Sequence, residues 1–370
     1  MTDTATYPTR RVDWLELFFD LVFVVIIKRL TDELHGSPGV DDFVKVVGLF
    51  AVSWLAWLNV TTFMNLSGAR PTDRRVPVLI SMSGVALIAI SIPEATSSAA
   101  PLFAIGYSVA RIAIWPLWMK VNRNSPFGWV RATIFGPGFA VLWLASILLP
   151  SDIRMWGWLL LVIGEVVFTA SGFSSAGLTV AHLLERVGLF IMIVLGESVV
   201  ELILAVHPDQ SAIAWAVSAG SFILICAIWW HYYQSGEPVS ERMLEASSGV
   251  VLRDVIVVAH FFVVLGLIGI AAGLGSAIEH ADDPHLHFGS VIALGGGIGL
   301  YHLANVIVAW RYGLGARDLA VLASIGVAVV AVFILGASWP AWVLVALLLV
   351  YMTIDAALAP WVVRHFRRTS

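Results

Sequence analysis

The sequence predicts an all-α, polytopic integral membrane protein of about twelve transmembrane helices. Apolar residues make up 59% of its 370 residues and charged residues only 12%, whereas a soluble domain is about 25% charged. Apolar segments of about 20 residues, the length that spans a bilayer, recur along the whole chain. We expect the first of them to be an uncleaved span, because it contains charges and lacks a small-residue cleavage site.

Twelve such segments follow one another, and turn-forming residues separate them. In order, they are 14–34, 43–65, 76–93, 101–120, 128–149, 156–176, 184–206, 211–234, 251–279, 286–312, 318–336 and 340–363. The clearest breaks are Ser37-Pro38-Gly39, Arg70-Pro71-Thr72-Asp73, Asn122 to Pro126, Ser235 to Pro238 and Asp282-Asp283-Pro284.

The distribution of basic residues tests this count. Of the 21 lysines and arginines, sixteen fall on the side of the amino terminus, four on the opposite side, and Arg111 lies within a span. Cytoplasmic loops of membrane proteins are enriched in Lys and Arg. We therefore expect an even number of spans in the cell (inner) membrane, with both termini cytoplasmic.

The two halves of the chain, 1–180 and 181–370, resemble each other within one membrane domain. A shift of 172 residues aligns the second span with the eighth without a gap, and the fourth span resembles the tenth. The matched residues include Gly48 with Gly220, Trp57 with Trp229, and Tyr107 with Tyr301. The halves are either two six-helix repeats of the same orientation or a few chance matches in a biased composition. Transporters often place their substrate site between such repeats.

Two carboxylates lie in the first span. Glu16 and Asp20 are four residues apart, so they share one face of a helix. Water can solvate Glu16 near the helix start, but Asp20 lies more than a turn further in, where an ionised group must be paired or hydrated. This stretch therefore predicts a structural or functional role for both.

The seventh span carries the second charged stretch. Glu185 and Arg186 open this span, and Glu197 follows about 18 Å further along the helix, inside the hydrocarbon. Glu201 lies on the same helical face as Glu197. Glu197 is either a carboxyl that takes up and releases a proton or a neutral carboxyl hydrogen-bonded to a neighbouring helix.

Arg111 needs a counter-charge, because a guanidinium cannot become neutral by losing a proton. Its possible partners are Asp20, Glu165 and Glu197. His260 and His302 are either proton carriers near neutral pH or hydrogen-bonded packing residues.

Glycine and tryptophan have simpler interpretations. We expect the glycine-rich stretches 269–273 and 295–299 to allow close helix packing, with a helix break beside a ligand as the alternative. We interpret most tryptophans as anchors at the membrane surface, among them Trp54, Trp57, Trp115, Trp118, Trp156, Trp158, Trp339 and Trp342.

We expect no cofactor and no metal. The loop His280 to His287 offers three imidazoles and two carboxylates, but we interpret it as a solvated loop. No nucleotide-binding loop, serine nucleophile elbow or HExxH motif occurs, and no basic patch indicates nucleic-acid binding. The expected partners are the lipid bilayer and an unknown small solute or ion. No oligomeric state follows from the sequence.

Two signatures resemble a known family. Residues 14–24, WLELFFDLVFV, are similar to the opening signature of the bacterial low temperature requirement A (LtrA) membrane proteins, and 185–198, ERVGLFIMIVLGES, to their second one. Trp229-Trp230, Arg253-Asp254 with His260, and His302 with Trp310-Arg311 also fit the pattern. The resemblance implies a multi-span inner-membrane protein linked by name to growth in the cold. It implies no biochemical activity and assigns Glu16, Asp20, Glu185, Arg186 and Glu197 only to signatures.

The leading hypothesis is a proton-coupled secondary transporter. Its candidate proton or substrate site comprises Glu16, Asp20, Arg111, Glu165, Glu185, Arg186, Glu197, Glu201, His260 and His302. The second hypothesis is an intramembrane enzyme acting on lipid, with His182, Glu185 and Arg186 as acid, base and phosphate-binding cation. The third is a membrane scaffold or sensor, in which the buried charges only hold helices together.

Overall fold

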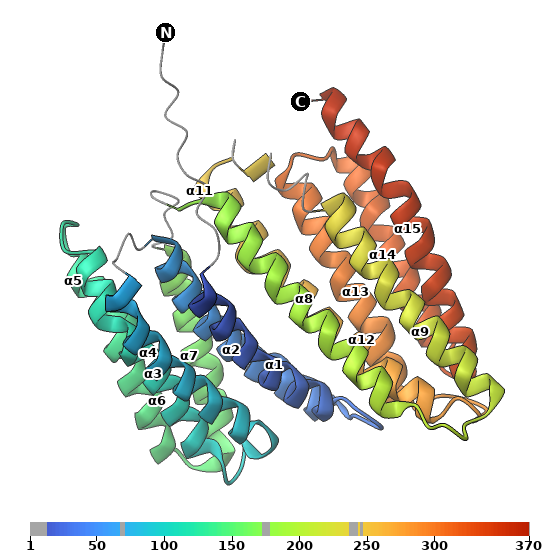
Figure 1. The fold of residues 1–370 in the computed structure, drawn as a ribbon, viewed down its shortest axis with the longest axis horizontal. Coiled ribbons are helices and arrows are strands. Elements are labelled where there is room, and N and C mark those ends of the chain that lie inside the picture. The colour runs from blue at the N-terminus through green and yellow to red at the C-terminus, as the bar shows by residue number, and fades with distance from the viewer. Residues whose placement is uncertain (1–12, 67–70, 172–177, 237–242, 245–246, 370) are drawn as a thin grey trace.

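The structure, a computed structural model, describes residues 13–66, 71–171, 178–236, 243–244 and 247–369 (Figure 1). This part of the chain contains helices and no strand, which confirms the predicted all-α class. Each of the twelve predicted segments coincides with one helix or with a run of consecutive helices.

The first half is built from six such units. They are α1 (Trp14–Glu33), α2 (Val40–Leu66), α3 (Pro71–Ser91) with η1 (Ile92–Glu94), α4 (Ala100–Val121), the run α5 (Gly128–Thr133), η2 (Ile134–Gly138), α6 (Phe139–Ala145) and η3 (Ser146–Leu148), and α7 (Ser151–Ser171). The turn η2 is π-helical and contains Pro137, which cannot donate a main-chain hydrogen bond.

The second half is also built from six units. They are α8 (Val180–Ala205), α9 (Ala212–Trp230) with η4 (His231–Gly236), the run α11 (Gly249–Arg253), η5 (Asp254–Ala259) and α12 (His260–Glu279), α13 (Phe288–Arg311), α14 (Ala316–Leu335) and α15 (Ala341–Thr369). Both η4 and η5 are π-helical.

Ten helices in the described residues are long and apolar enough to cross a membrane. The helix α1 is not one of them because it is rich in charged residues, and the apolar part of α15, Ala341–Ala357, is shorter than the other ten. A soluble fold does not expose so many long apolar helices. The protein is therefore a multi-pass membrane protein.

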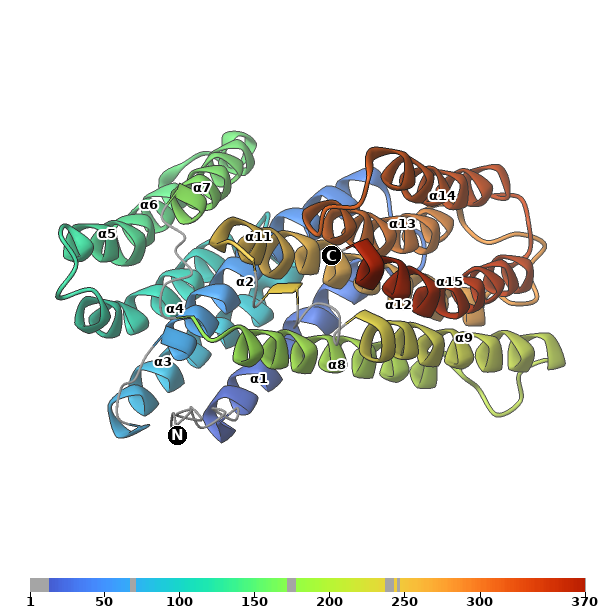
Figure 2. The same cartoon turned by 90° about the horizontal axis from the view of Figure 1, so that it is seen from above.

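The helices form two groups that meet along α1 and α8. One group contains α3 to α7, and the other contains α9 and α12 to α15 (Figures 1 and 2). Between them, α1 packs against α8 and α12, and α2 packs against the same two helices. The interface between the two halves therefore runs along α1, α2, α8 and α12.

Each half contains one helix crossing made by a pair of glycines. A Cβ atom on Gly84 of α3 would lie 2.5 Å from the carbonyl oxygen of Gly106 of α4. In the second half, a Cβ on Gly266 of α12 would lie 2.5 Å from the carbonyl oxygen of Gly297 of α13. Glycine is required at both crossings because the backbones themselves are in contact. The crossings make Gly106 and Gly297 equivalent positions. This alignment of the two halves differs by three residues, about one helical turn, from the sequence alignment that matches Tyr107 with Tyr301.

The glycine-rich stretches serve packing, as predicted. A Cβ on Gly269 would lie 2.8 Å from the carbonyl oxygen of Ala293, and one on Gly295 would lie 2.5 Å from the Cβ of Phe333. The helices α12 and α13 continue through both stretches without interruption. The alternative of a helix break at these glycines is therefore wrong.

Several tryptophans are core residues rather than membrane-surface anchors. Trp57 is fully buried, and Trp54 and Trp158 are 3% and 5% exposed. The anchor interpretation is wrong for these three, because their rings stack against other aromatic rings inside the bundle. Trp156 and Trp342, by contrast, are exposed.

Candidate functional site

The charged residues of α1 and α8 face each other across the interface between the halves. Glu16 meets His182, Asp20 meets Arg186 one turn further on, and Lys28 meets Glu201 near the carboxyl ends of both helices. Residue numbers increase in the same order along α1 and α8 from one contact to the next, so the two helices run in the same direction. The spacing of four residues places Glu16 with Asp20, and His182 with Arg186, on the facing sides.

We call the first group, Glu16, Asp20, His182 and Arg186, the proximal cluster. A terminal nitrogen of Arg186 lies 2.6 Å from Asp20 Oδ1 and donates to Thr61 Oγ1 at 3.2 Å. The other terminal nitrogen of Arg186 lies 3.6 Å from Glu16 Oε2. All four side chains are buried. The cluster is thus a charged network without contact to solvent.

A tryptophan of α2 completes the coordination of Asp20. Trp57 donates its indole N–H to Asp20 Oδ1 at 2.8 Å, and its ring lies 6.0 Å from the guanidinium carbon of Arg186. Asp20 Oδ1 therefore receives two donors, whereas Asp20 Oδ2 is buried without a hydrogen-bond partner in the described residues. Nε and one terminal nitrogen of Arg186 also lack hydrogen-bond partners there.

Asn65 fixes the orientation of the His182 ring. The Thr179 amide donates to Asn65 Oδ1 at 2.8 Å, and Asn65 Nδ2 donates to the Thr179 carbonyl at 2.9 Å. This pair orients the amide so that Nδ2 also faces His182 Nδ1 at 3.0 Å. Because Nδ1 accepts that bond, Nε2 carries the proton that is donated to Glu16 Oε2 at 2.9 Å.

A further ion pair joins α3 to the start of α1. Arg74 lies 2.7 Å from Asp13 and 3.9 Å from Glu16 Oε1. The Asp13 amide contacts Glu16 Oε2 at 3.3 Å, as part of a capping box that begins α1. Glu16 therefore serves two roles, since it caps its own helix and pairs with α3 and α8.

We call the second group, Lys28, Glu197 and Glu201, the distal cluster. Lys28 pairs with both Glu201 and Asp32. Glu197 is 4% exposed, and its Oε1 has no hydrogen-bond partner in the described residues. Gly196, by contrast, lies on the exposed side of α8 with open space around it, so it does not leave room beside Glu197.

An aromatic layer separates the two clusters. Phe190 of α8 contacts Trp57 at 4.9 Å, Trp54 at 5.8 Å and Phe23 at 5.9 Å between ring centroids. Glu197 follows Arg186 by three turns of α8, about 16 Å. The aromatic layer, Phe23, Trp54, Trp57 and Phe190, fills the space between these two charges with apolar side chains.

Arg111 and Glu165 form a separate pair within the first half. The structure selects Glu165 of α7 from the three possible partners of Arg111. Arg111 also donates to the Tyr107 hydroxyl at 2.6 Å and, through Nε, to the Phe135 carbonyl at 3.1 Å. Glu165 accepts from Trp143 and Tyr107 at 2.7 and 2.6 Å. Every polar atom of this pair has a partner, as in an ion pair that holds helices together.

The other predicted site residues lie apart from both clusters. His260 bonds to Tyr232 at 3.0 Å and to the Val255 carbonyl at 2.8 Å. His302 bonds to Tyr351 at 2.5 Å and to the Leu322 carbonyl at 2.8 Å. Glu185 is exposed on α8, on a different side from His182 and Arg186. The structure thus divides the predicted site into the two clusters, the Arg111–Glu165 pair and three separate residues.

Sequence reasoning missed several residues of the site. Trp57, Thr61 and Arg74 contact the proximal cluster, and Lys28 pairs with the distal one. One signal was available for Lys28, since a lysine within an apolar run needs a carboxylate. Arg253 pairs with Asp254 at 2.6 Å, and Arg311 lies 3.1 Å from the same carboxylate. Within the described ranges, no group of three or more His, Cys, Asp or Glu residues is placed to hold a metal ion.

Apolar helices packed around buried ion pairs define a multi-pass α-helical membrane protein with a charged interior. Over residues 11–357, the sequence matches the family described as Bacterial low temperature requirement A protein (LtrA), and the chain belongs to this family. The resemblance predicted from the two signatures is confirmed. An uncharacterized protein of Rhizobium meliloti (strain 1021) is 24% identical over 304 residues, which cover 76% of this chain and 73% of that protein. No solved structure matches the chain.

Proposed function

We propose that this protein is a proton-coupled secondary transporter of a small solute in the inner membrane. Its twelve helical units would all cross the membrane, with both termini in the cytoplasm, as two six-helix halves in the same orientation. The paired glycine crossings and the side-by-side position of α1 and α8, the first helix of each half, support this arrangement.

The observation that carries the proposal is the incomplete pairing of Asp20 and Arg186. Both side chains are fully buried, yet one oxygen of Asp20 and two nitrogens of Arg186 lack hydrogen-bond partners among the residues that the structure describes. Buried charged groups in natural proteins are normally hydrogen-bonded, so an incompletely bonded pair indicates a functional role. A proton on Asp20 removes its attraction for Arg186, and Glu16 is then the carboxylate that remains beside Arg186.

The two clusters suit alternating access to the two sides of the membrane. Each cluster lies at one end of the α1–α8 interface, and the aromatic layer lies between them. Because α1 and α8 belong to different halves, a small rotation of the halves would open one end of the interface and close the other. Protonation of Asp20 or Glu197 would bias that rotation.

The test is proton uptake into proteoliposomes of the purified protein under an imposed membrane potential. The vesicles contain a low-molecular-weight extract of host cells, so that a strictly coupled carrier has its solute. We expect uptake with the wild type, none with Asp20→Asn or Glu197→Gln, and normal uptake with Asp41→Asn, an exposed carboxylate at the start of α2. Equal uptake by all four proteins, or none by the wild type, would overturn the proposal.

A further inference from the structure

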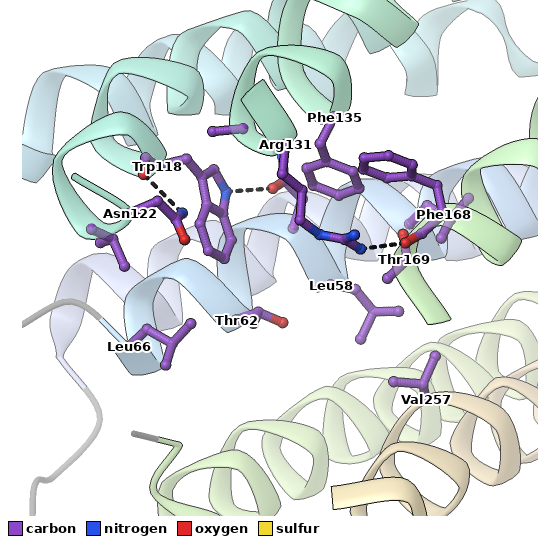
Figure 3. Close-up of a pocket in the computed structure, with 14 residues that line it drawn as sticks. Leu58, Thr62, Leu66, Trp118, Asn122, Arg131, Phe135, Phe168, Thr169 and Val257 are labelled. Atoms are coloured by element: carbon purple, nitrogen blue, oxygen red, sulfur yellow. Dashed lines mark hydrogen bonds between the residues drawn. The ribbon is translucent and has the colours of Figure 1, made fainter. Parts of the chain in front are cut away.

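A cavity of about 290 Å³ lies in the first half, away from both charged clusters (Figure 3). Helices α2, α4, α5 and α7 surround it, and Val257 of η5 closes it from the second half. Its volume is at the lower end of the roughly 300–1,000 Å³ of small-molecule sites. The cavity therefore suits a small ligand and is too small for a whole lipid.

Most of the cavity wall is apolar and aromatic. The rings of Phe135 and Phe168 are nearly parallel, with an angle of 13° between their planes. Leu55, Leu58 and Trp118 complete the apolar lining. Such a wall favours a ligand with a flat or branched apolar body.

Arg131 supplies the only charge among the described residues that line the cavity. Its guanidinium carbon lies 4.4 Å from the ring centroid of Phe168, and one terminal nitrogen donates to the Phe168 carbonyl. These contacts hold the side chain against Phe168 (Figure 3). None of the described lining residues is acidic, and Arg131 forms no ion pair within the described part of the chain. A cation without a counter-charge attracts an anion.

Two neutral groups offer further hydrogen bonds. Asn59 Oδ1 accepts the indole N–H of Trp118 at 2.8 Å, which leaves the Asn59 amide nitrogen as a donor. The Thr169 hydroxyl is buried without a hydrogen-bond partner in the described residues. Donors and a cation thus gather on the polar side of an otherwise apolar cavity, an arrangement that suits a carboxylate or phosphate.

We propose that this cavity binds a small organic anion with an apolar body, held by Arg131 and by the aromatic wall. Identifying this anion with the transported solute is a separate step, which rests on the proposed function. Binding itself does not, because Arg131 contacts neither the proximal nor the distal cluster.

The test measures binding by calorimetry, with the full-length protein in phosphatidylcholine nanodiscs. The probe is 4-phenylbutyrate, and its uncharged amide is the matched control ligand. We expect the amide to bind at least about tenfold more weakly, since it cannot form a charge-assisted pair. The variant Arg131→Gln should weaken phenylbutyrate binding by about 10- to 100-fold. Arg317→Gln, which changes an exposed arginine at the start of α14, should leave it unchanged.

Three results would overturn the proposal: no binding of phenylbutyrate to the wild type, equal binding of its amide, or no effect of Arg131→Gln. If Arg131→Gln fails to fold, Thr62→Phe replaces it, because Thr62 lines the cavity and a phenyl ring there should block binding.

The same titration in nanodiscs with phosphatidylglycerol distinguishes two sources of the anion. Competition by this lipid assigns the cavity to an anionic headgroup, and an unchanged affinity assigns it to a soluble anion. Asp20→Asn should bind phenylbutyrate normally, so this experiment can fail independently of the proton-uptake experiment.

Discussion

Two buried arginines, Arg111 and Arg186, differ in how completely they are hydrogen-bonded. Arg111 and Arg186 are both almost fully buried. Arg111 has a single carboxylate partner, Glu165, and every one of its nitrogens is bonded. Arg186 has two carboxylates within reach, but two of its nitrogens have no hydrogen-bond partner in the described part of the chain. Complete bonding suits a permanent structural pair, and incomplete bonding with two partners suits a pair that changes.

This contrast predicts the order of stability of two variants. Glu165→Gln leaves Arg111 buried without a counter-charge, and we expect it to destabilise the protein by about 3–5 kcal/mol. Asp20→Asn should cost less, because Arg186 keeps Glu16 and the new amide oxygen still accepts from Trp57. Thermal unfolding in detergent measures both. An unfolding temperature that is lower for Asp20→Asn than for Glu165→Gln would contradict this interpretation.

A double variant separates a proton-carrying role of Asp20 from a purely structural one. Asp20→Asn combined with Arg186→Gln removes both charges, so the double variant should regain much of the stability that Arg186→Gln alone loses. If the two charges only hold helices together, proton uptake returns with stability. If Asp20 carries protons, uptake stays absent although the fold recovers. Unfolding temperature and proton uptake, measured on the same preparations, decide between the two.

At the scale of the helix, close packing and aromatic filling define the interfaces. The crossings of α3 with α4 and of α12 with α13 depend on glycine pairs whose backbones touch. At the α1–α8 interface, rings from α1, α2 and α8 form the aromatic layer. The first feature makes each half rigid, and the second separates two charged regions.

The glycine crossings predict a sharp difference between glycines. Gly84→Ala and Gly266→Ala place a methyl group against the backbone of the neighbouring helix, so each should destabilise the protein by about 1–3 kcal/mol. Gly48→Ala is the matched control, because nothing lies within 4 Å of its added Cβ. It should be neutral or stabilising by up to about 1 kcal/mol. Thermal unfolding in nanodiscs tests the three, and similar losses for all would show that the crossings are not tight.

The aromatic layer predicts that protons enter without solute when one of its rings is removed. Phe190→Leu keeps an apolar side chain but removes the ring that contacts Phe23, Trp54 and Trp57. We expect faster proton entry without solute, because water then reaches further between the clusters. Dye-reported proton flux in empty proteoliposomes measures this. Phe222→Leu, on the exposed side of α9, is the control and should not leak.

For the whole molecule, the sequence predicted the positions of the helices well, but it predicted poorly which side chains pair with one another. Helix positions followed because a bilayer imposes a local rule of length and polarity, so every predicted segment coincides with helical structure. Pairing is not local. Three carboxylates were equivalent partners for Arg111 until the fold brought α7 beside α4. Likewise, composition alone cannot distinguish Trp57, which donates to Asp20, from a tryptophan at the membrane surface.

The proposed topology gives the last prediction, since it depends on whether α1 and α15 cross the membrane. With Cys226 replaced by serine, a single new cysteine is placed in one loop at a time and labelled with an impermeant maleimide on intact cells. If α1 crosses, Ser37→Cys, in the loop after α1, should react from outside. If α15 crosses, Ser338→Cys, in the loop before α15, should also react. Ser125→Cys, between α4 and α5, should be protected until the cells are opened. Labelling at Ser125→Cys alone would invert the orientation. An outside tag at the amino terminus together with a reactive Ser37→Cys would remove α1 from the set of spans and separate the proximal cluster from a membrane interior. An outside tag at the carboxyl terminus together with a reactive Ser338→Cys would remove α15.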